Sequence, residues 1–186
     1  LILVYYARIN YGEVLPTLFN ASGALAYVIS GSGETICQDE VIKWGEGDVF
    51  LMPGGKKQTH RAFKEPVILW IATNEPQLGF ENSSTKDGTL VSGIVHYPSQ
   101  EIDRQFDLIY SIDADQDVSG AAVIFSSCDQ ELNKNILPTL TAGINSLPPN
   151  AKQRPHRHNG IAISLVIDGE GCFSLIDGKK KKWLPW

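Results

Sequence analysis

An internal repeat constrains the fold of this chain more than any other feature of its sequence. The segment 27–33 (YVISGSG) aligns with the segment 165–171 (LVIDGEG), 138 residues further along the chain. Each copy has an apolar run, a Gly-x-Gly turn, a second β-rich run, another turn and then a tryptophan. That tryptophan is Trp44 in the first copy and Trp183 in the second, where one extra residue intervenes. Such self-similarity predicts two related structural modules in one chain.

Short β-rich runs recur between turn signals along the whole chain, in which 17 glycines and 10 prolines are dispersed. This spacing predicts an all-β protein with an antiparallel sandwich or barrel. The strands are expected at residues 3–6, 25–29, 49–52, 67–71, 91–95, 121–125, 161–167 and 172–176. One short helix is expected from Asp129 to Ile136, with Ser127 or Asp129 as its N-cap and Pro138 just beyond its end.

Composition excludes several classes of partner. The net charge is -5, from 16 basic and 21 acidic side chains. This balance does not indicate the positively charged surface that nucleic-acid binding needs. The apolar runs are much shorter than the roughly 20 residues needed to cross a bilayer, so no membrane partner is expected. The three cysteines, without a CxxC pair, argue against a disulfide framework or a structural zinc site and favour a cytoplasmic protein with reduced thiols.

The ends of the sequence favour an excerpt of a longer chain. It begins at Leu1, ends at Trp186 and contains one methionine, Met52. No signal peptide is visible at its start.

Two histidines, His156 and His158, stand two positions apart just before the expected strand 161–167. Alternate side chains of an extended segment point to the same side, so both imidazoles could reach one metal ion. Imidazole suits iron, copper, nickel and zinc, and the spacing does not choose among them. The alternative is a pair of surface histidines in a basic turn that also holds Arg154 and Arg157.

Two longer motifs surround these residues. Residues 156–171 read HRHNGIAISLVIDGEG, which matches the first cupin motif, an HxH followed by a glycine-rich turn. Residues 47–55 read GDVFLMPGG and are followed by His60, which matches the second motif. The chain therefore resembles the cupin superfamily, and the HRH-to-GEG stretch is similar to that of bicupins of the gentisate 1,2-dioxygenase type, whose relatives act on salicylate or hydroxynaphthoate. The resemblance covers most of residues 9–75 and 139–186.

The resemblance implies two copies of a double-stranded β-helix, the jelly-roll-like cupin barrel, of which the second is incomplete in this chain. The first copy is expected to be degenerate, because the repeat puts Leu18 and Asn20 where the second has His156 and His158. The expected division is an N-terminal cupin over residues 1–80, a linker with strands and a short helix over 81–138, and the first part of a C-terminal cupin over 139–186.

The resemblance also implies a ferrous ion, or another divalent metal, bound by His156, His158 and a third histidine, without a glutamate ligand. By the repeat, the counterpart of His60 would fall about 13 residues beyond Trp186. His60 itself is a weaker candidate ligand, and we expect it to be a hydrogen-bonded remnant of a lost site. No catalytic residue is assigned besides the metal ligands.

The implied function is that of a non-heme metal-dependent dioxygenase that cleaves the ring of a hydroxylated aromatic carboxylate with O₂. Its expected partners are a small aromatic acid, O₂ and further copies of the same chain, because cupins expose sheet edges that can pair between subunits. The alternative is a non-catalytic cupin that binds a small molecule or serves as an assembly module. A histidine at the repeat position beyond Trp186 would favour the enzyme, and an apolar residue there the binding module.

Three other features receive structural interpretations. His96 has no partner at ligand spacing and is expected at a strand end or on the surface. Asp48 lies in a turn, where aspartate commonly accepts hydrogen bonds from the backbone. The lysine run 179–182 follows Asp177-Gly178 and is expected at a solvated hairpin.

Overall fold

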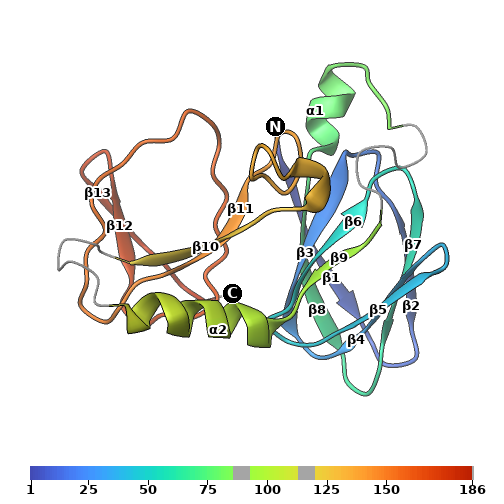
Figure 1. Cartoon of the computed structure of the whole chain (residues 1–186), viewed down its shortest axis with the longest axis horizontal. Helices are drawn as coiled ribbons and strands as arrows, with labels where there is room; N and C mark the ends of the chain where they lie inside the picture. Colours follow the sequence, from blue (N-terminus) through green and yellow to red (C-terminus); the bar gives the residue numbers. More distant parts are fainter. Residues whose placement is uncertain (86–92, 113–119, 186) are drawn as a thin grey trace. The chain divides into compact units, whose positions relative to one another are not determined.

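A computed structural model describes residues 1–85, 93–112 and 120–185 of the chain (Figure 1). These residues form two compact units, 1–155 and 156–186. The first unit contains strands β1 (Leu3–Ile9), β2 (Val14–Leu18), β3 (Gly23–Ser30), β4 (Gly33–Cys37), β5 (Glu40–Trp44), β6 (Val49–Pro53), β7 (Lys57–Ala62), β8 (Val67–Thr73), β9 (Val95–Tyr97), β10 (Ala121–Phe125) and β11 (Ala142–Ser146), with helices α1 (Glu75–Phe80) and α2 (Ser99–Ser111). The second unit contains strands β12 (Phe173–Ile176) and β13 (Lys179–Lys182).

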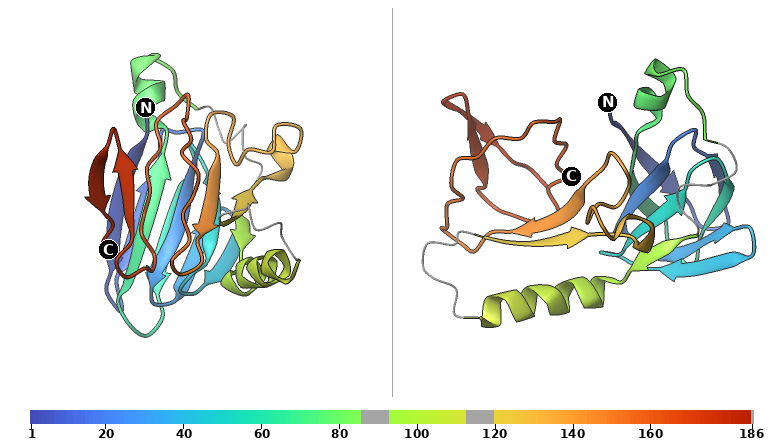
Figure 2. Two further views of the ribbon diagram at one scale, coloured as in Figure 1. Left: turned by 90° about the vertical axis from the view of Figure 1, so that its left-hand side faces the viewer. Right: turned by 45° about the horizontal axis from the view of Figure 1, so that its top comes forward.

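Two antiparallel sheets build the N-terminal barrel (Figures 1 and 2). The five-stranded sheet has the order β1-β8-β3-β6-β9, and the four-stranded sheet has the order β2-β7-β4-β5. Most neighbouring strands are distant in the sequence, as they are in a jelly roll. The architecture confirms the all-β, cupin-type barrel that the sequence predicts.

The central strand β3 is covered on both faces. Ala24, Ala26 and Val28 point into the barrel, where they pack against residues of β6 and β8 such as Phe50. Leu25, on the opposite face, belongs to a second apolar cluster outside the barrel. Because a strand buried on both faces has no solvent-facing positions, its sequence is continuously apolar rather than alternating.

The second cluster joins the five-stranded sheet to the segment that follows the barrel. Ile102 of α2, Phe125 of β10 and the loop residue Leu137 pack with Leu25 and Leu51. Helix α2 lies alongside β10, as the right panel of Figure 2 shows. The residues after the barrel therefore cover the outer face of its larger sheet.

The prediction of a helix from Asp129 to Ile136 is wrong. The structure has only a 3₁₀ turn at Cys128–Gln130, and Lys134 has a φ of 51°, which an α-helix does not allow. Ile136 and Leu137 lie in a loop, and both side chains are fully buried in the second cluster. Burying these two neighbouring side chains does not require a helix. The sequence interpretation missed α2, whose apolar residues Ile102 and Phe106 are four positions apart on one face.

Most of the other predicted strands are present. Those at 3–6, 25–29, 49–52, 67–71 and 121–125 lie within β1, β3, β6, β8 and β10, and the one at 172–176 is β12. The strand predicted at 91–95 falls partly outside the described residues, and β9 begins at Val95. Residues 161–167 have no regular secondary structure. In the first copy the corresponding strand β3 is paired on both sides, by β6 and β8, and no residues up to 186 correspond to those partners.

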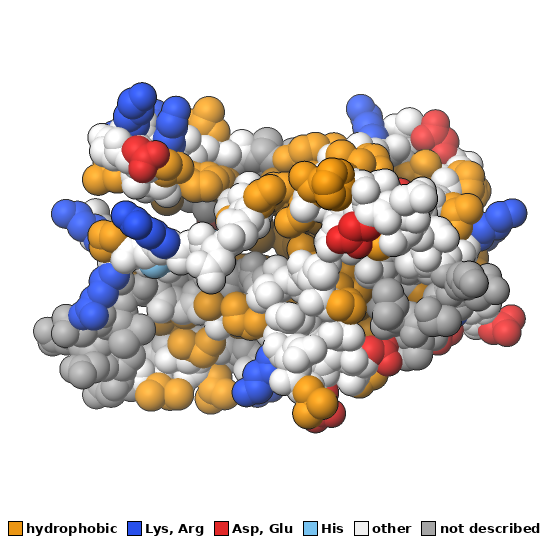
Figure 3. Space-filling model, turned by 90° about the horizontal axis from the view of Figure 1, so that it is seen from above, with side chains coloured by type: hydrophobic (Ala, Val, Ile, Leu, Met, Phe, Trp, Pro, Cys, Tyr) orange, Lys and Arg blue, Asp and Glu red, His pale blue; other side chains and the backbone are white. Residues whose placement is uncertain are grey.

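The second unit contains a hairpin that repeats β4–β5. Cys37 pairs with Glu40 at the end of the first hairpin, and Ile176 pairs with Lys179 at the end of the second. The lysines of β13 are all exposed, as expected for a solvated hairpin. Figure 3 shows Lys and Arg side chains projecting outward at the side of the molecule where Figure 1 labels β13.

Neither helix of the described ranges has the length and apolar character needed to cross a membrane.

Replacing Gly33 with alanine should destabilise the barrel by about 1–3 kcal/mol, since an added methyl group overpacks the core. A Cβ at this position would meet the carbonyl oxygen of Arg61 and the ring of Trp44. Urea unfolding measures the effect. Gly45→Ala is the matched control, because a Cβ there has no heavy atom within 4 Å. Equal unfolding midpoints for the two variants would contradict this account of the β4–β7 contact.

Candidate functional site

His60 lies at the centre of the four-stranded sheet. Its strand β7 is hydrogen-bonded to β2 on one side and β4 on the other, and Thr35 of β4 stands directly opposite it. The His60 side chain is fully buried. Burial lowers the pKa of this imidazole to about 4, so the ring is neutral near pH 7.

The first half of a hydrogen-bond chain fixes one nitrogen of this ring. Gln58 Nε2 donates to the carbonyl oxygen of Pro53 at 2.7 Å, so Gln58 Oε1 is the acceptor for the Thr17 hydroxyl at 3.1 Å. Since the hydroxyl hydrogen of Thr17 is used there, Thr17 Oγ1 accepts from His60 Nε2 at 2.9 Å. The proton of the neutral imidazole is therefore on Nε2.

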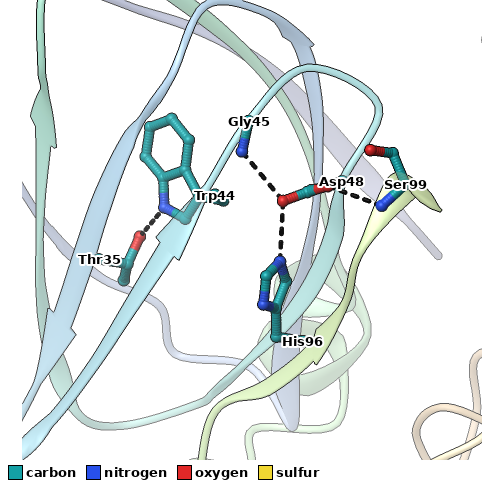
Figure 4. A network of polar contacts seen from close by, with 6 residues as sticks. All are labelled: Thr35, Trp44, Gly45, Asp48, His96 and Ser99. Carbon is teal, nitrogen blue, oxygen red and sulfur yellow. Dashed lines mark hydrogen bonds and ion pairs between the residues drawn. The ribbon is translucent and has the colours of Figure 1, made fainter. Parts of the chain in front are cut away.

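The second half of the chain occupies the other nitrogen. His60 Nδ1 is 2.8 Å from Thr35 Oγ1, and as the unprotonated nitrogen it accepts from that hydroxyl. Thr35 Oγ1 itself accepts from Trp44 Nε1 at 2.8 Å (Figure 4). Both nitrogens of His60 are thus engaged in a buried, fully connected network, and a metal ion could bind only by displacing one of these partners.

Asp48 anchors the segment that follows the barrel. Its carboxylate accepts hydrogen bonds from the amides of Gly45 at 2.9 Å and Ser99 at 2.7 Å, and it lies 2.9 Å from His96 Nε2 (Figure 4). Burial opposes ionisation of Asp48, but these hydrogen bonds outweigh it and lower the pKa of the carboxyl. The contact ties β9 and the start of α2 to the β5–β6 turn.

Two contacts of this region differ in whether the sequence could have revealed them. His96, expected at a strand end or on the surface, lies in the middle of the short strand β9 and is partly buried, and its pairing with Asp48 was missed. The two residues are 48 positions apart, so no local spacing could reveal the contact. The Thr35–Trp44 contact could have been recognised in the sequence, because Ser174 and Trp183 show the same nine-residue spacing in the second copy.

His156 and His158 lie in the second unit, in exposed chain without regular structure. Their ring centres are 4.9 Å apart and their planes are nearly perpendicular, at 88°. Two imidazoles in adjacent positions of one metal ion have ring centres about 4.5–5 Å apart, given metal–nitrogen bonds of about 2.1 Å. The two rings meet edge to face, and the donor chemistry of imidazole suits a divalent ion.

The other candidate ligand, His60, lies in the first unit. Over residues 1–85, 93–112 and 120–185, no group of three or more His, Cys, Asp or Glu side chains is placed to hold a metal ion. Leu18 and Asn20, which the repeat aligns with His156 and His158, are exposed in the first unit. The assignment of His156 and His158 as ligands, and of His60 as a remnant, remains a prediction.

Comparison with known proteins gives partial matches. No family model matches the chain. It is 28% identical over 92 residues to 5-aminosalicylate 1,2-dioxygenase of Comamonas sp., covering 41% of this chain and 25% of that protein. It is 38% identical over 60 residues to 1-hydroxy-2-naphthoate 1,2-dioxygenase of Nocardioides sp. (strain KP7), covering 31% of this chain and 16% of that protein. The chain thus spans a quarter or less of these curated relatives.

Solved structures extend the similarity in fold. Salicylate 1,2-dioxygenase from Pseudaminobacter salicylatoxidans matches with a TM-score of 0.62 and 16% identity, covering 78% of this chain and 52% of that one. This match shows a common fold. Together with the two curated relatives, it confirms the resemblance to gentisate-dioxygenase-like cupins.

The stability of the barrel should decrease in acid through His60. Because the folded pKa is about 4 and the ordinary value is 6.5, the unfolded chain binds a proton more readily between these values. The contribution of neutral His60 to the free energy of unfolding is complete above pH 6.5 and is lost as the pH falls towards 4. The whole loss is about 3 kcal/mol. Urea unfolding of the wild type and His60→Gln at both ends of this range measures it. A similar pH dependence in both proteins would contradict the assignment.

Asp48→Ala should destabilise the first unit by about 1–3 kcal/mol, because the amides of Gly45 and Ser99 lose their acceptor. Hydrogen exchange should be faster at the start of α2 than in the wild type. Asp107→Ala, on the exposed side of the same helix, serves as the control. Unchanged protection of α2 in Asp48→Ala would show that the carboxylate does not anchor this segment.

Proposed function

We propose that the protein is a non-heme metal-dependent dioxygenase that opens the ring of a hydroxylated aromatic carboxylate with O₂. The observation that carries the proposal is the neighbouring pair of imidazoles, His156 and His158, within a cupin motif. The similarity to dioxygenases of 5-aminosalicylate and 1-hydroxy-2-naphthoate supports the substrate class. Both of these compounds carry a hydroxyl group beside a carboxylate.

The metal ion of this proposal is Fe²⁺, with other divalent metals as alternatives that the same ligands accept. His156 and His158 would hold it together with a third histidine, which the repeat places at the counterpart of His60. When bound, the ion supplies the redox chemistry that allows the ring to react with O₂. Three neutral imidazoles add no negative charge that would repel a carboxylate substrate.

The charge of the sequence segment that holds the pair is consistent with an anionic substrate. Basic side chains outnumber acidic ones in residues 150–186, although the whole chain is acidic. Such a local excess of positive charge attracts anions and raises their rate of association. The basic residues are Lys152, Arg154, Arg157 and Lys179–Lys182, and the acidic ones are Asp168, Glu170 and Asp177.

The first cupin has a structural role in this proposal. The two nitrogens of His60 are bonded to Thr17 and Thr35, and the positions that the repeat aligns with the HxH hold Leu18 and Asn20. Its larger sheet supports α2 and β10, which lead to the second module.

Metal analysis and oxygen uptake test the proposal on the complete protein. The wild type should contain bound iron and consume O₂ with gentisate, salicylate or hydroxynaphthoate. His156→Ala and His158→Ala should each lower metal affinity and turnover by more than about 100-fold, since loss of a direct ligand exceeds the effect of an outer-shell change. His96→Gln is the control, because His96 contacts Asp48 in the other unit.

Absence of metal from the wild-type protein, or full metal retention in both alanine variants, would overturn the proposal. Tight binding of an aromatic acid with neither metal nor oxygen uptake would instead support a non-catalytic binding cupin.

A further inference from the structure

Large exposed apolar side chains are concentrated on the first two strands of the barrel. Six of them lie in residues 3–18, which hold β1 and β2. By contrast, residues 19–73, which hold the six strands from β3 to β8, contain two. Such a concentration indicates an interaction surface, whereas single exposed apolar residues do not. The six side chains, named here the β1–β2 patch, are Leu3, Tyr5, Tyr6, Tyr11, Val14 and Leu18.

Strands β1 and β2 lie on the same side of the barrel. Each is the last strand of its sheet, and only residues 10–13 separate the two in the sequence. Strand β1 pairs with β8 along its whole length, from Leu3 to Ile9. On its other side it has no strand partner within the described parts of the chain. The outward backbone N–H and C=O groups of β1 are therefore open to a further strand.

The other edge strands of the barrel carry features that oppose pairing with a further strand. Strand β2 has Pro16, which has no backbone N–H, at its centre. Strand β5 has the exposed charged residues Glu40 and Lys43, and β9 has only three residues. Strand β1 has seven residues, no proline or lysine, and one charged side chain, Arg8. Because native sheets protect their exposed edges by such features, the unprotected edge of β1 is expected to be covered by a partner.

We propose that β1 pairs with the β1 strand of a second copy of this chain, in antiparallel direction across a twofold axis. Such an axis brings the same edge of both copies together, so that outward donors of one β1 strand find acceptors on the other. The two five-stranded sheets become one continuous sheet. The inference concerns the first unit alone, so it does not depend on the metal site of the proposed function.

The charge of this region suits an identical partner. The chain has a net charge of -5, so two copies repel each other on average. Residues 1–18 contain one basic side chain, Arg8, and one acidic side chain, Glu13. Two copies can therefore approach at the β1–β2 patch without net repulsion. A strongly charged partner would find no complementary charge there.

The area of the β1–β2 patch is sufficient for a stable dimer. Tyr6 and Tyr11 are 62% and 69% exposed. At about 150–250 Å² for a large side chain, the six residues expose roughly 600 Å² in each copy. The paired backbones add to this area, and a standard interface buries about 800 Å² on each partner. Tyrosine is also among the residues that contribute most to binding energy at interfaces.

Analytical ultracentrifugation of Tyr6→Lys in the complete protein tests the pairing. A lysine on an edge strand opposes pairing, and twofold symmetry would place two of them close together. The substitution should raise the dissociation constant of the β1–β1 contact by about 10-fold or more. Val41→Lys is the matched control, because Val41 is similarly exposed, at 54%, on the edge strand β5. It should leave the dissociation constant unchanged.

Hydrogen exchange of the wild type is a second measurement, which also decides the question if Tyr6→Lys does not fold. When β1 is paired only with β8, alternate amides face outward and exchange fast. Pairing with a second β1 strand should slow these amides by about 10-fold or more once the protein concentration exceeds the dissociation constant.

A monomeric wild type, or an unchanged dissociation constant in folded Tyr6→Lys, would overturn the inference. Slow exchange of the outward amides at every protein concentration would also overturn it, because another part of the same chain would then cover β1. None of these results bears on metal binding by His156 and His158, so the proposed function keeps its own test.

Discussion

Pairing between strands that are distant in the sequence is the constraint on which the rest of the structure depends. Strand β3 is held between β6 and β8, and its two faces are buried in two different apolar clusters. Its counterpart at 161–167 has a similar apolar sequence but forms no strand. An isolated strand leaves its backbone donors and acceptors without partners, so sequence propensity alone cannot hold it in a sheet.

The buried network around His60 shows how the barrel satisfies both nitrogens of a buried histidine with hydrogen bonds. Every polar group from Trp44 to Gln58 has a defined partner, and the ring is neutral. A fully connected network of this kind avoids the cost of an unsatisfied buried group. His156 and His158 differ physically, because they are exposed and their rings contact each other edge to face.

The hairpins β4–β5 and β12–β13 explain why part of this organisation could be predicted. Their strands are adjacent in sequence and joined by short turns, so local residues determine them. The helix wrongly placed at 129–136 shows the opposite case. Its segment has a plausible cap and a following proline, but Ile136 and Leu137 are drawn into a core formed by β3, β6 and α2. Tertiary packing there outweighs local helix signals.

The sequence by itself determined the all-β class, the repeat, the positions of most strands and the HRH pair, because these depend on residue type at short spacing. Only the tertiary structure decided that Asp48 pairs with His96 and that His60 bonds through both nitrogens. The reason is physical. Hydrogen bonds across a sheet join residues tens of positions apart, and their partners are set by strand register.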